Sequence, residues 1–269
     1  MNMSATRPYK LIVFDIDGTI LDAKHKVCIK LKPIVAKLCA KGYLFTLVSA
    51  RLPLSVIYIA QELGLTDEAV ITLNGSFITN QQHQILYNKT FLHSHVADML
   101  ARMDRRIAIN YYSGFDWVVE NPSKYTQMEI DFMLPVVCIP NTILTHTKLN
   151  KITLMGESGL LLKAQQLLSQ DPTLLAHFSL ENYLEVSCKS ISKFSGLEYY
   201  AKQKHIDMEQ IIAFGDGEND ISMLCGVGLG VAMGNAASNV KNAAHKIIGN
   251  HFEQGVANCL EQLIAEKVL

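Results

Sequence analysis

The chain has 269 residues, and 24 Lys and Arg face 25 Asp and Glu, which gives a formal net charge of −1. Without a basic excess, the chain cannot neutralise a nucleic-acid backbone or an anionic membrane surface, so neither partner is expected. Hydrophobic residues make up 49% and charged residues 18%, which is typical of a globular protein and not of a disordered one.

The sequence has no segment typical of export or membrane insertion. No run approaches the roughly 18 apolar residues of a membrane span, and the apolar run 11–14 is too short for the core of a signal peptide. The six cysteines include no C-x-x-C pair, which argues against a zinc site or a disulfide framework. We therefore expect a cytoplasmic protein with buried free thiols.

The first third of the chain alternates strand patterns with helical patterns. Strands are expected at residues 10–14, 43–48 and 69–73, and helices at residues 28–40 and 53–64. Strands separated by helices pair in parallel through right-handed crossovers, with helices on both faces of the sheet. This part of the chain therefore predicts an α/β fold.

Near residue 76 the pattern changes to shorter elements, beginning with a predicted hairpin of strands 76–79 and 84–87. Further elements are expected at residues 94–102 (helix), 106–112, 116–120 and 148–155 (strands), 160–168 (helix) and 177–187 (paired strands). From about residue 191 the alternation returns, at residues 196–204 (helix), 210–214, 228–231 and 246–248 (strands) and 254–266 (helix). The simplest organisation is an α/β domain, residues 1–79 plus 186–269, interrupted by an inserted α+β domain, residues 80–185.

Two acids, Asp15 and Asp17, follow the first predicted strand in the run Phe-Asp-Ile-Asp-Gly-Thr. In open parallel sheets, ligands bind outside the carboxyl ends of the strands, so both acids lie where a site is expected. One carboxylate can attack phosphorus to give an aspartyl phosphate, and the other can transfer the proton. The alternative is a solvated acidic turn.

A second acidic run, Gly-Asp-Gly-Glu-Asn-Asp, follows the predicted strand at 210–214. If a helix begins at this run, Asp216, Asn219 and Asp220 lie on one face of it. Oxygen-rich groups at a strand end suit Mg²⁺, which prefers carboxylate ligands and retains several waters. The alternative is that these residues only cap a helix.

Two weaker signals complete the pattern. Ser49 and Ala50 follow the second predicted strand, where a hydroxyl and a backbone N–H can hold a phosphate oxygen, although a plain helix cap is the alternative. Lys193 lies where the α/β pattern returns and could neutralise a phosphate and a carboxylate nucleophile, with Lys189 as a nearby rival.

Taken in this order, these elements resemble the haloacid dehalogenase-like hydrolase superfamily, and most closely its Cof-type phosphatases (subfamily IIB). The resemblance covers nearly the whole chain and is supported by Asn74-Gly75 and by residues 230–236 (GVAMGNA) and 255–257 (GVA). It implies a Rossmann-like parallel-sheet core with an inserted α+β domain, the cap, which sets substrate specificity.

The resemblance also implies a role for each site residue. Asp15 would be the nucleophile and a Mg²⁺ ligand, and Asp17 the general acid/base, binding Mg²⁺ through its backbone carbonyl. Asp216 would be a further Mg²⁺ ligand, and Asp220 would support the site. The phosphate would be bound by residues from all four motifs: Ile16 and Ala50 through their N–H groups, Ser49, Lys193 and Asn219.

The function implied is Mg²⁺-dependent hydrolysis of small phosphorylated metabolites, such as sugar phosphates, pyridoxal phosphate or flavin mononucleotide, through an aspartyl phosphate. A phosphosugar mutase with the same intermediate, or a catalytically weak protein that binds a phosphorylated metabolite, are the alternatives. The sequence does not indicate an oligomeric state.

Two residues depart from the family pattern, because Ala50 stands where the family usually has Gly, and Phe194 where it often does. A positive φ at Ala50 would cost roughly 1 kcal/mol. The bulk of Phe194 beside Lys193 bears on the register of the motif that contains this lysine.

Overall fold

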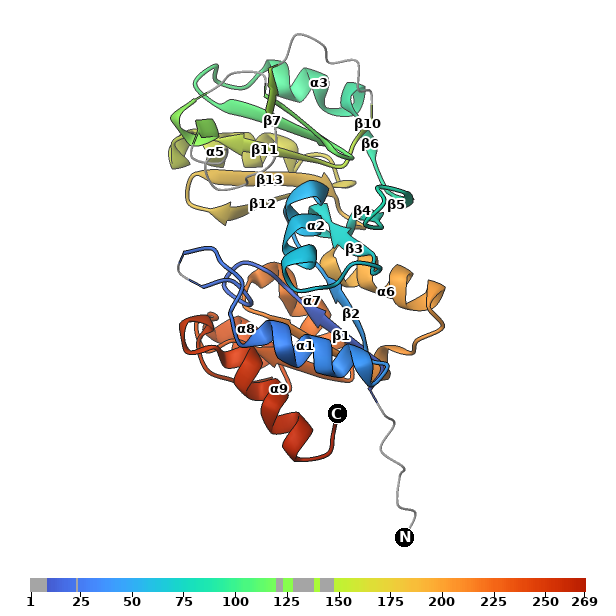
Figure 1. Cartoon of the computed structure of the whole chain (residues 1–269). Coiled ribbons are helices and arrows are strands. Elements are labelled where there is room, and N and C mark those ends of the chain that lie inside the picture. Colours follow the sequence, from blue (N-terminus) through green and yellow to red (C-terminus); the bar gives the residue numbers. More distant parts are fainter. Residues whose placement is uncertain (1–8, 23, 120–122, 128–137, 141–147) are drawn as a thin grey trace.

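The computed structural model describes residues 9–22, 24–119, 123–127, 138–140 and 148–269. These residues form two parts, an α/β part that holds both ends of the described chain and an α+β part inserted into it (Figure 1). The predicted fold class is thereby confirmed. No helix among the described residues has both the length and the apolar character needed to cross a bilayer.

The α/β part, here called the core, is built on a parallel sheet with the strand order β16-β15-β14-β1-β2. Its strands are β1 (Leu11–Phe14), β2 (Leu44–Leu47), β14 (Ile211–Gly215), β15 (Leu229–Ala232) and β16 (Lys246–Ile247). The two central strands, β1 and β14, are buried along their whole length. This burial explains their continuous apolar runs, because helices cover both faces of the sheet.

Successive residues of β1 supply both faces of the sheet, since side chains alternate along a strand. The helices of the core are α1 (Leu31–Ala40), α2 (Pro53–Glu62), α6 (Lys193–Gln203), α7 (Ile221–Gly226), α8 (Ser238–Ala243) and α9 (Gly255–Ala265). Ile12 and Phe14 pack in one apolar cluster with α1, α2 and α9, whereas Leu11 and Val13 pack in another with α6, α7 and α8. Short 3₁₀ turns lie at η2 (Met208–Gln210), η3 (Glu218–Asp220) and η4 (His251–Glu253).

Helix α6 begins three residues earlier than expected, at Lys193. The reason is a cap: the Ser192 hydroxyl accepts the backbone N–H of Ser195 at 3.1 Å, and the Ser195 hydroxyl accepts that of Ser192 at 2.9 Å. This reciprocal pair satisfies N–H groups that a helix start otherwise leaves unbonded. Lys193 therefore stands in the first turn of the helix.

A small antiparallel sheet connects the core to the insertion, with strands β3 (Val70–Thr72), β4 (Phe77–Thr79) and β5 (Ile85–Asn88). This sheet confirms the predicted hairpin, and a parallel bridge from Val48 to Ile71 joins it to the end of β2. Between β3 and β4 lies η1 (Leu73–Gly75), whose three residues all have positive φ. A Cβ at Gly75 would lie 2.2 Å from the Ser192 carbonyl oxygen, so glycine allows this turn to touch the start of α6.

The inserted part is a sheet with the order β12-β13-β11-β7-β8-β9, antiparallel except between β8 and β9. Its strands are β7 (Ala108–Ser113), β8 (Asp116–Val119), β9 (Cys138–Pro140), β11 (Lys151–Met155), β12 (Leu174–Leu180) and β13 (Tyr183–Cys188). Helices α3 (His93–Ala101) and α5 (Ser158–Leu168) share an apolar cluster with one face of this sheet.

The strand predicted at residues 148–155 is in fact two strands. The first, β10 (Lys148–Leu149), pairs with β6 (Phe91–Leu92), and the second is β11. Asn150 separates them, because its side chain accepts the N–H of Gly114 at 2.7 Å and donates to the Lys89 carbonyl at 3.1 Å. Residue 120, the last of the strand expected at 116–120, lies outside the described residues.

The prediction of buried thiols is wrong for Cys39 and Cys225, which are exposed, whereas Cys259 is buried. On α1 the buried side is formed by Leu31, Ile34, Val35 and Leu38. Cys39 follows this set by one residue, and one residue turns the helix by about 100°, which places its thiol towards solvent.

Candidate active site

The acidic side chains expected to form a site do converge at the carboxyl ends of neighbouring parallel strands. Asp15 follows β1 and Asp216 follows β14, and these two strands are paired in register from Leu11–Ile211 to Phe14–Phe214. Ser49 lies just beyond β2, on the other side of β1. The parallel sheet thus brings three segments together that are far apart in the sequence.

Asp15 is buried, and hydrogen bonds hold both of its carboxylate oxygens. The Lys193 ammonium donates to Oδ1 at 2.7 Å, and the Thr19 hydroxyl donates to Oδ2 at 2.8 Å. Lys193 also donates to Oδ1 of the buried Asp220 at 2.7 Å. Lys193 and not its rival Lys189, which is exposed, therefore reaches the acidic cluster.

The charges of this cluster are strongly coupled. Burial and the neighbouring Asp220 carboxylate raise the pKa of Asp15 well above its usual value, against the opposing effect of Lys193. The pKa of Lys193 is also raised: burial alone would lower it, but the Asp15 and Asp220 carboxylates outweigh that effect. One buried cation thus faces at least two acids, which leaves an excess of negative charge in a desolvated site.

Asp216 adds a third carboxylate to the cluster. The Asn235 side chain donates to its Oδ2 at 2.9 Å. Burial and the Asp220 carboxylate raise the pKa of Asp216 to about 6. Gly18, with φ +71°, lies against this carboxylate, since a Cβ there would come within 2.1 Å of Oδ2; a glycine is needed for the acids to approach this closely.

The expectation that a helix places Asp216, Asn219 and Asp220 on one face is wrong in its detail. The 3₁₀ turn η3 ends at Asp220, and the α-helix begins only after it, at Ile221. The Asp220 carboxylate turns back and accepts the N–H groups of Asp216 at 3.1 Å and Gly217 at 2.9 Å. Asp220 therefore does act as a cap, while it also bonds Lys193 in the cluster.

Three carboxylates are close enough to bind one cation. One ligand oxygen from each of Asp15, Asp216 and Asp220 lies within 4.8 Å of the others. Hard oxygen ligands and excess negative charge are what Mg²⁺ requires, so the residues present fit this ion. The side chain of Asp17 is not in this group.

The carboxylate of Asp17 is held by Arg51, a residue to which no sequence motif assigned a role. Nε of Arg51 donates to Asp17 Oδ2 at 2.7 Å, and its Nη2 donates to Oδ1. Arg51 itself is buried and also donates to Ser55 at 3.2 Å, whereas the Asp17 side chain is 45% exposed. The two-pronged geometry orients Asp17 at the mouth of the cluster.

The predicted phosphate-binding residues lie around the same point. Ser49 is buried and its hydroxyl accepts the N–H of Arg51 at 3.2 Å. Ile16 is buried between Asp15 and Asp17. Ala50 does not have the positive φ that would strain it, so its departure from the family pattern carries no backbone penalty. Phe194 packs against Gly226 of α7 and leaves Lys193 in place.

A cavity of about 430 Å³ lies between the two parts of the molecule, next to these residues. The core supplies all the acids described above, together with Ser49, Ala50, Lys193 and Asn219. The insertion supplies one segment of the edge strand β12: His177, Phe178, Ser179 and Leu180. In Figure 1, β12 is the strand of the inserted sheet nearest the core.

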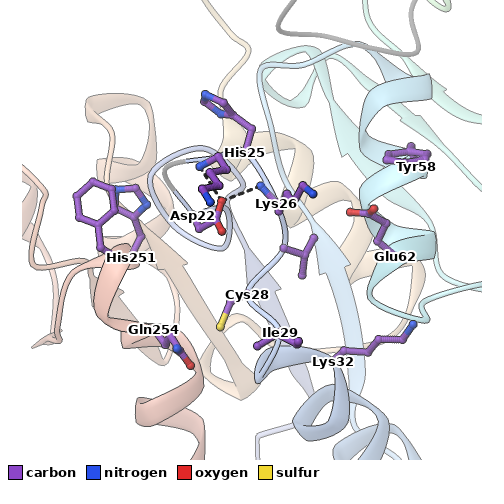
Figure 2. Close-up of a pocket in the computed structure, with 13 residues that line it drawn as sticks. Asp22, His25, Lys26, Cys28, Ile29, Lys32, Tyr58, Glu62, His251 and Gln254 are labelled. Atoms are coloured by element: carbon purple, nitrogen blue, oxygen red, sulfur yellow. Dashed lines mark hydrogen bonds between the residues drawn. The ribbon is translucent and has the colours of Figure 1, made fainter.

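A second cavity, of about 820 Å³, lies elsewhere on the core (Figure 2). Tyr58 and Glu62 of α2 border it on one side, and His251 and Gln254 on the other. None of the predicted site residues lines it, and the Asp22 carboxylate within it is already bonded by backbone N–H groups of its own loop, at 2.7 Å and 3.0 Å. The larger cavity therefore lacks the convergent acids of the smaller one.

Sequence reasoning missed several residues that the fold brings to the site. Thr19 lay inside the quoted first motif, and Asn74 and Asn235 inside the supporting segments, so each carried a local signal. His177, Lys151 and Glu185 lie in the insertion and carried none. Asn74 and Glu185, which share a hydrogen bond, are 111 residues apart in the chain.

Comparison with known proteins gives consistent similarities along the sequence. A family model described as haloacid dehalogenase-like hydrolase matches residues 12–260. A putative phosphatase of Haemophilus influenzae is 29% identical, over 96% of this chain and 99% of that protein. A 5-amino-6-(5-phospho-D-ribitylamino)uracil phosphatase of Bacillus subtilis is 26% identical, over 95% of this chain and 96% of that protein.

Solved structures agree in fold over the same length. A haloacid dehalogenase-like hydrolase from Bacteroides thetaiotaomicron has a TM-score of 0.85 and 28% identity, over 95% of this chain and 99% of that chain. A subclass IIB sugar phosphatase has a TM-score of 0.81 and 22% identity, over 97% of this chain and 100% of that chain. The shared fold includes the insertion as well as the parallel sheet.

Proposed function

Because this chain belongs to the haloacid dehalogenase-like hydrolase family and its relatives are named phosphatases, we propose a specific reaction for it. The reaction is Mg²⁺-dependent hydrolysis of small phosphorylated metabolites through an aspartyl phosphate on Asp15. The observation that supports it best is the buried Asp15 carboxylate, fixed by Lys193 and Thr19 beside two further acids.

In the first half of the reaction, an oxygen of Asp15 attacks the phosphorus atom. The bond from phosphorus to Asp15 forms as the bond to the leaving oxygen breaks, and Asp17 gives that oxygen a proton. Asp17 lines the cavity but is bonded to Arg51 in this structure, so it must exchange Arg51 for the leaving oxygen. Lys193 stays beside the reacting carboxylate and stabilises the added negative charge.

In the second half, a water molecule attacks the phosphorus of the aspartyl phosphate and Asp17 accepts its proton. Inorganic phosphate leaves, and Asp15 is restored as a carboxylate. The Ser49 hydroxyl, the Asn219 amide and the N–H groups of Ile16 and Ala50 would hold the phosphoryl oxygens through both steps.

Mg²⁺ would be held by the carboxylates of Asp15 and Asp216 and by the Asp17 carbonyl. When bound, it supplies Lewis-acid stabilisation of the charge on the transferring phosphoryl group. Asp220 would support the site, since it bonds Lys193 and the backbone that carries Asp216.

We further propose that residues 80–185 form a cap that sets substrate specificity. The cap strand β12 supplies the wall of the cavity that faces the acids, so it is placed to contact the part of the substrate that leaves. Sugar phosphates, pyridoxal phosphate and flavin mononucleotide remain the expected substrate classes, and a cytoplasmic location remains a prediction from the sequence.

The test is release of inorganic phosphate from a broad panel of phosphorylated metabolites, with Mg²⁺ and with a chelator. If the proposal is correct, the protein releases phosphate only with Mg²⁺. A phosphosugar mutase would release little and interconvert isomers, and a binding protein would release none. Phosphate release that persists in the chelator, with metal content measured as zero, would contradict the proposed role of Mg²⁺.

A further inference from the structure

A buried ion pair in the cap lies next to the active site without lining its cavity. Lys151 of β11 and Glu185 of β13 are on adjacent antiparallel strands, and the Lys151 ammonium donates to Glu185 Oε1 at 3.2 Å. Their side chains are only 3% and 9% exposed. Thr153 is paired directly with Glu185, so Lys151, two residues away, projects on the same face of the sheet.

Both members of the pair reach across to the core. Lys151 donates a second hydrogen bond to the Ala50 carbonyl at 3.2 Å. Glu185 Oε2 accepts one from the Asn74 amide at 2.7 Å. The contacts therefore join two strands of the cap to two different loops of the core.

The core loops reached are those that hold the predicted phosphate ligands. Ala50 belongs to the loop after β2, and the Ser49 carbonyl accepts the Asn74 backbone N–H at 3.0 Å. The Asn74 side-chain oxygen in turn accepts the amide of Asn219 at 3.0 Å. A continuous chain of hydrogen bonds thus runs from Lys151 and Glu185 to three of the core residues that are proposed to bind phosphate, Ser49, Ala50 and Asn219.

Stability alone is a poor explanation for this pair. A buried ion pair costs desolvation, and its replacement by uncharged side chains of similar shape is often neutral or stabilising. The two parts already share an apolar contact nearby, where Tyr112 and Trp117 of the cap pack with Leu52, Leu73 and Phe77 of the core. The charged contact is therefore better explained by the core loops that it orients.

We propose that Lys151 and Glu185 are positioning residues, which align Ala50 and Asn219 for phosphate only while the cap is docked on the core. Lys151 holds the Ala50 carbonyl and so restrains the peptide unit that follows Ala50. The unit that carries the Ala50 N–H is held at its Ser49 carbonyl by Asn74. Glu185 fixes both Asn74 and, through it, Asn219. Phosphate binding and cap docking then stabilise each other, because each requires the same arrangement of the two loops. This proposal rests on the proposed function, since it takes Ala50 and Asn219 as phosphate ligands.

The experiment measures the affinity of inorganic phosphate in the presence of Mg²⁺, by titration calorimetry, and the kinetics of an aryl phosphate. The variants are Lys151→Met, Glu185→Gln and the double variant, which removes both charges at nearly constant shape. Lys148→Met, at the exposed start of β10, and Glu181→Gln, in the exposed turn between β12 and β13, are the matched controls.

We expect phosphate to bind at least tenfold more weakly to the double variant, with a higher KM and a lower kcat, while the melting temperature stays close to that of the wild type. The single variants each leave one buried charge without its partner, so they should be less stable, and the double variant decides the question. The controls should match the wild type in every measurement.

Phosphate affinity within twofold of the wild type in the folded double variant would overturn the proposal. So would failure of the double variant to fold, because the pair would then serve stability. If the wild type binds phosphate but releases none from any substrate, the proposed function fails instead, and the affinities still test the pair.

Discussion

The two walls of the proposed active-site cavity differ in chemistry and in how firmly their side chains are held. On the core wall, the side chains of Asp15, Lys193 and Asp220 are buried and bonded to one another. On the cap wall, Phe178 is half-buried and Leu180 is 63% exposed. The Nδ1 atom of His177 is buried and has no hydrogen-bond partner among the described residues.

This difference indicates that the two walls have separate roles, one in catalysis and one in selection among substrates. Catalysis requires groups that are fixed in place before the substrate arrives, since reorganisation during the reaction would raise the barrier. Selection among leaving groups requires a wall whose side chains can be substituted without disturbing the catalytic groups. The five predictions that follow test this separation.

The largest effect is expected from Asp15→Asn. The amide cannot form the aspartyl phosphate, so phosphate release should fall by a factor of about 10³ or more, measured with an aryl phosphate and with the best natural substrate. Asp22→Asn, in the second cavity, is the control and should keep wild-type turnover. Wild-type activity in Asp15→Asn would show that Asp15 is not the nucleophile.

Lys193→Met should come next. Loss of the buried cation leaves Asp15 and Asp220 without compensation, so turnover should fall by about 10²-fold or more, and the folded state should lose roughly 3–5 kcal/mol. Mg²⁺ should then raise the melting temperature more in this variant than in the wild type, because it restores positive charge. Equal Mg²⁺-induced shifts in both proteins would contradict the charge argument.

The pKa of Asp216 predicts a pH dependence for metal binding. With a pKa of about 6, this carboxyl is protonated more often at pH 5.5 than at pH 7.5. Since the raised pKa of Asp15 acts in the same direction, the apparent affinity for Mg²⁺ should be weaker at the lower pH by about fourfold or more. Titration calorimetry at the two pH values measures this change. Asp216→Asn should bind Mg²⁺ weakly at both.

The same group predicts a change of stability in the metal-free protein. Its folded pKa lies above the ordinary value of 3.8, so the folded state holds this proton more tightly than the unfolded chain does. Its contribution to stability is therefore full below pH 3.8 and is lost as the pH rises through about 6. Urea unfolding at pH 5 and pH 7.5 measures this loss of stability in the wild type. The loss should be absent in Asp216→Asn.

The smallest effect is expected on the cap wall, from His177→Ala. It should reduce kcat/KM by about tenfold for substrates whose leaving group bonds the imidazole, and by less than threefold for an aryl phosphate. Leu175→Ala, on the same strand but outside the cavity, is the control. An equal loss for all substrates would place His177 with the catalytic groups and would contradict separate roles for the two walls.

Local patterns were sufficient for much of the fold. The run 11–14 predicted a buried strand because a strand covered on both faces has no polar side, and β1 is buried throughout. Element ends were less accurate, because they depend on particular hydrogen bonds. Helix α6 begins at Lys193 through the Ser192 cap, and Asn150 divides a predicted strand in two.

The acids of the site were predictable because each lies directly after an apolar strand, and parallel strands place their carboxyl ends at one edge. The choice between Lys193 and Lys189 was not, because it depends on which side chain spans the distance to Asp15, 178 residues earlier in the chain. The pairing of Asp17 with Arg51 was also not predictable, since it joins the loops that follow two different strands.

The sequence by itself therefore determined the α/β alternation, the presence of an insertion and the acids that meet at the strand ends. These features depend on periodicity and on the residue types that follow each strand, which are local properties of the chain. Only the tertiary structure decided which wall the cap supplies and that Lys151 and Glu185 bond the loops of Ala50 and Asn74. Contacts between two domains depend on how their surfaces dock, and residues that meet there share no spacing or pattern in the sequence.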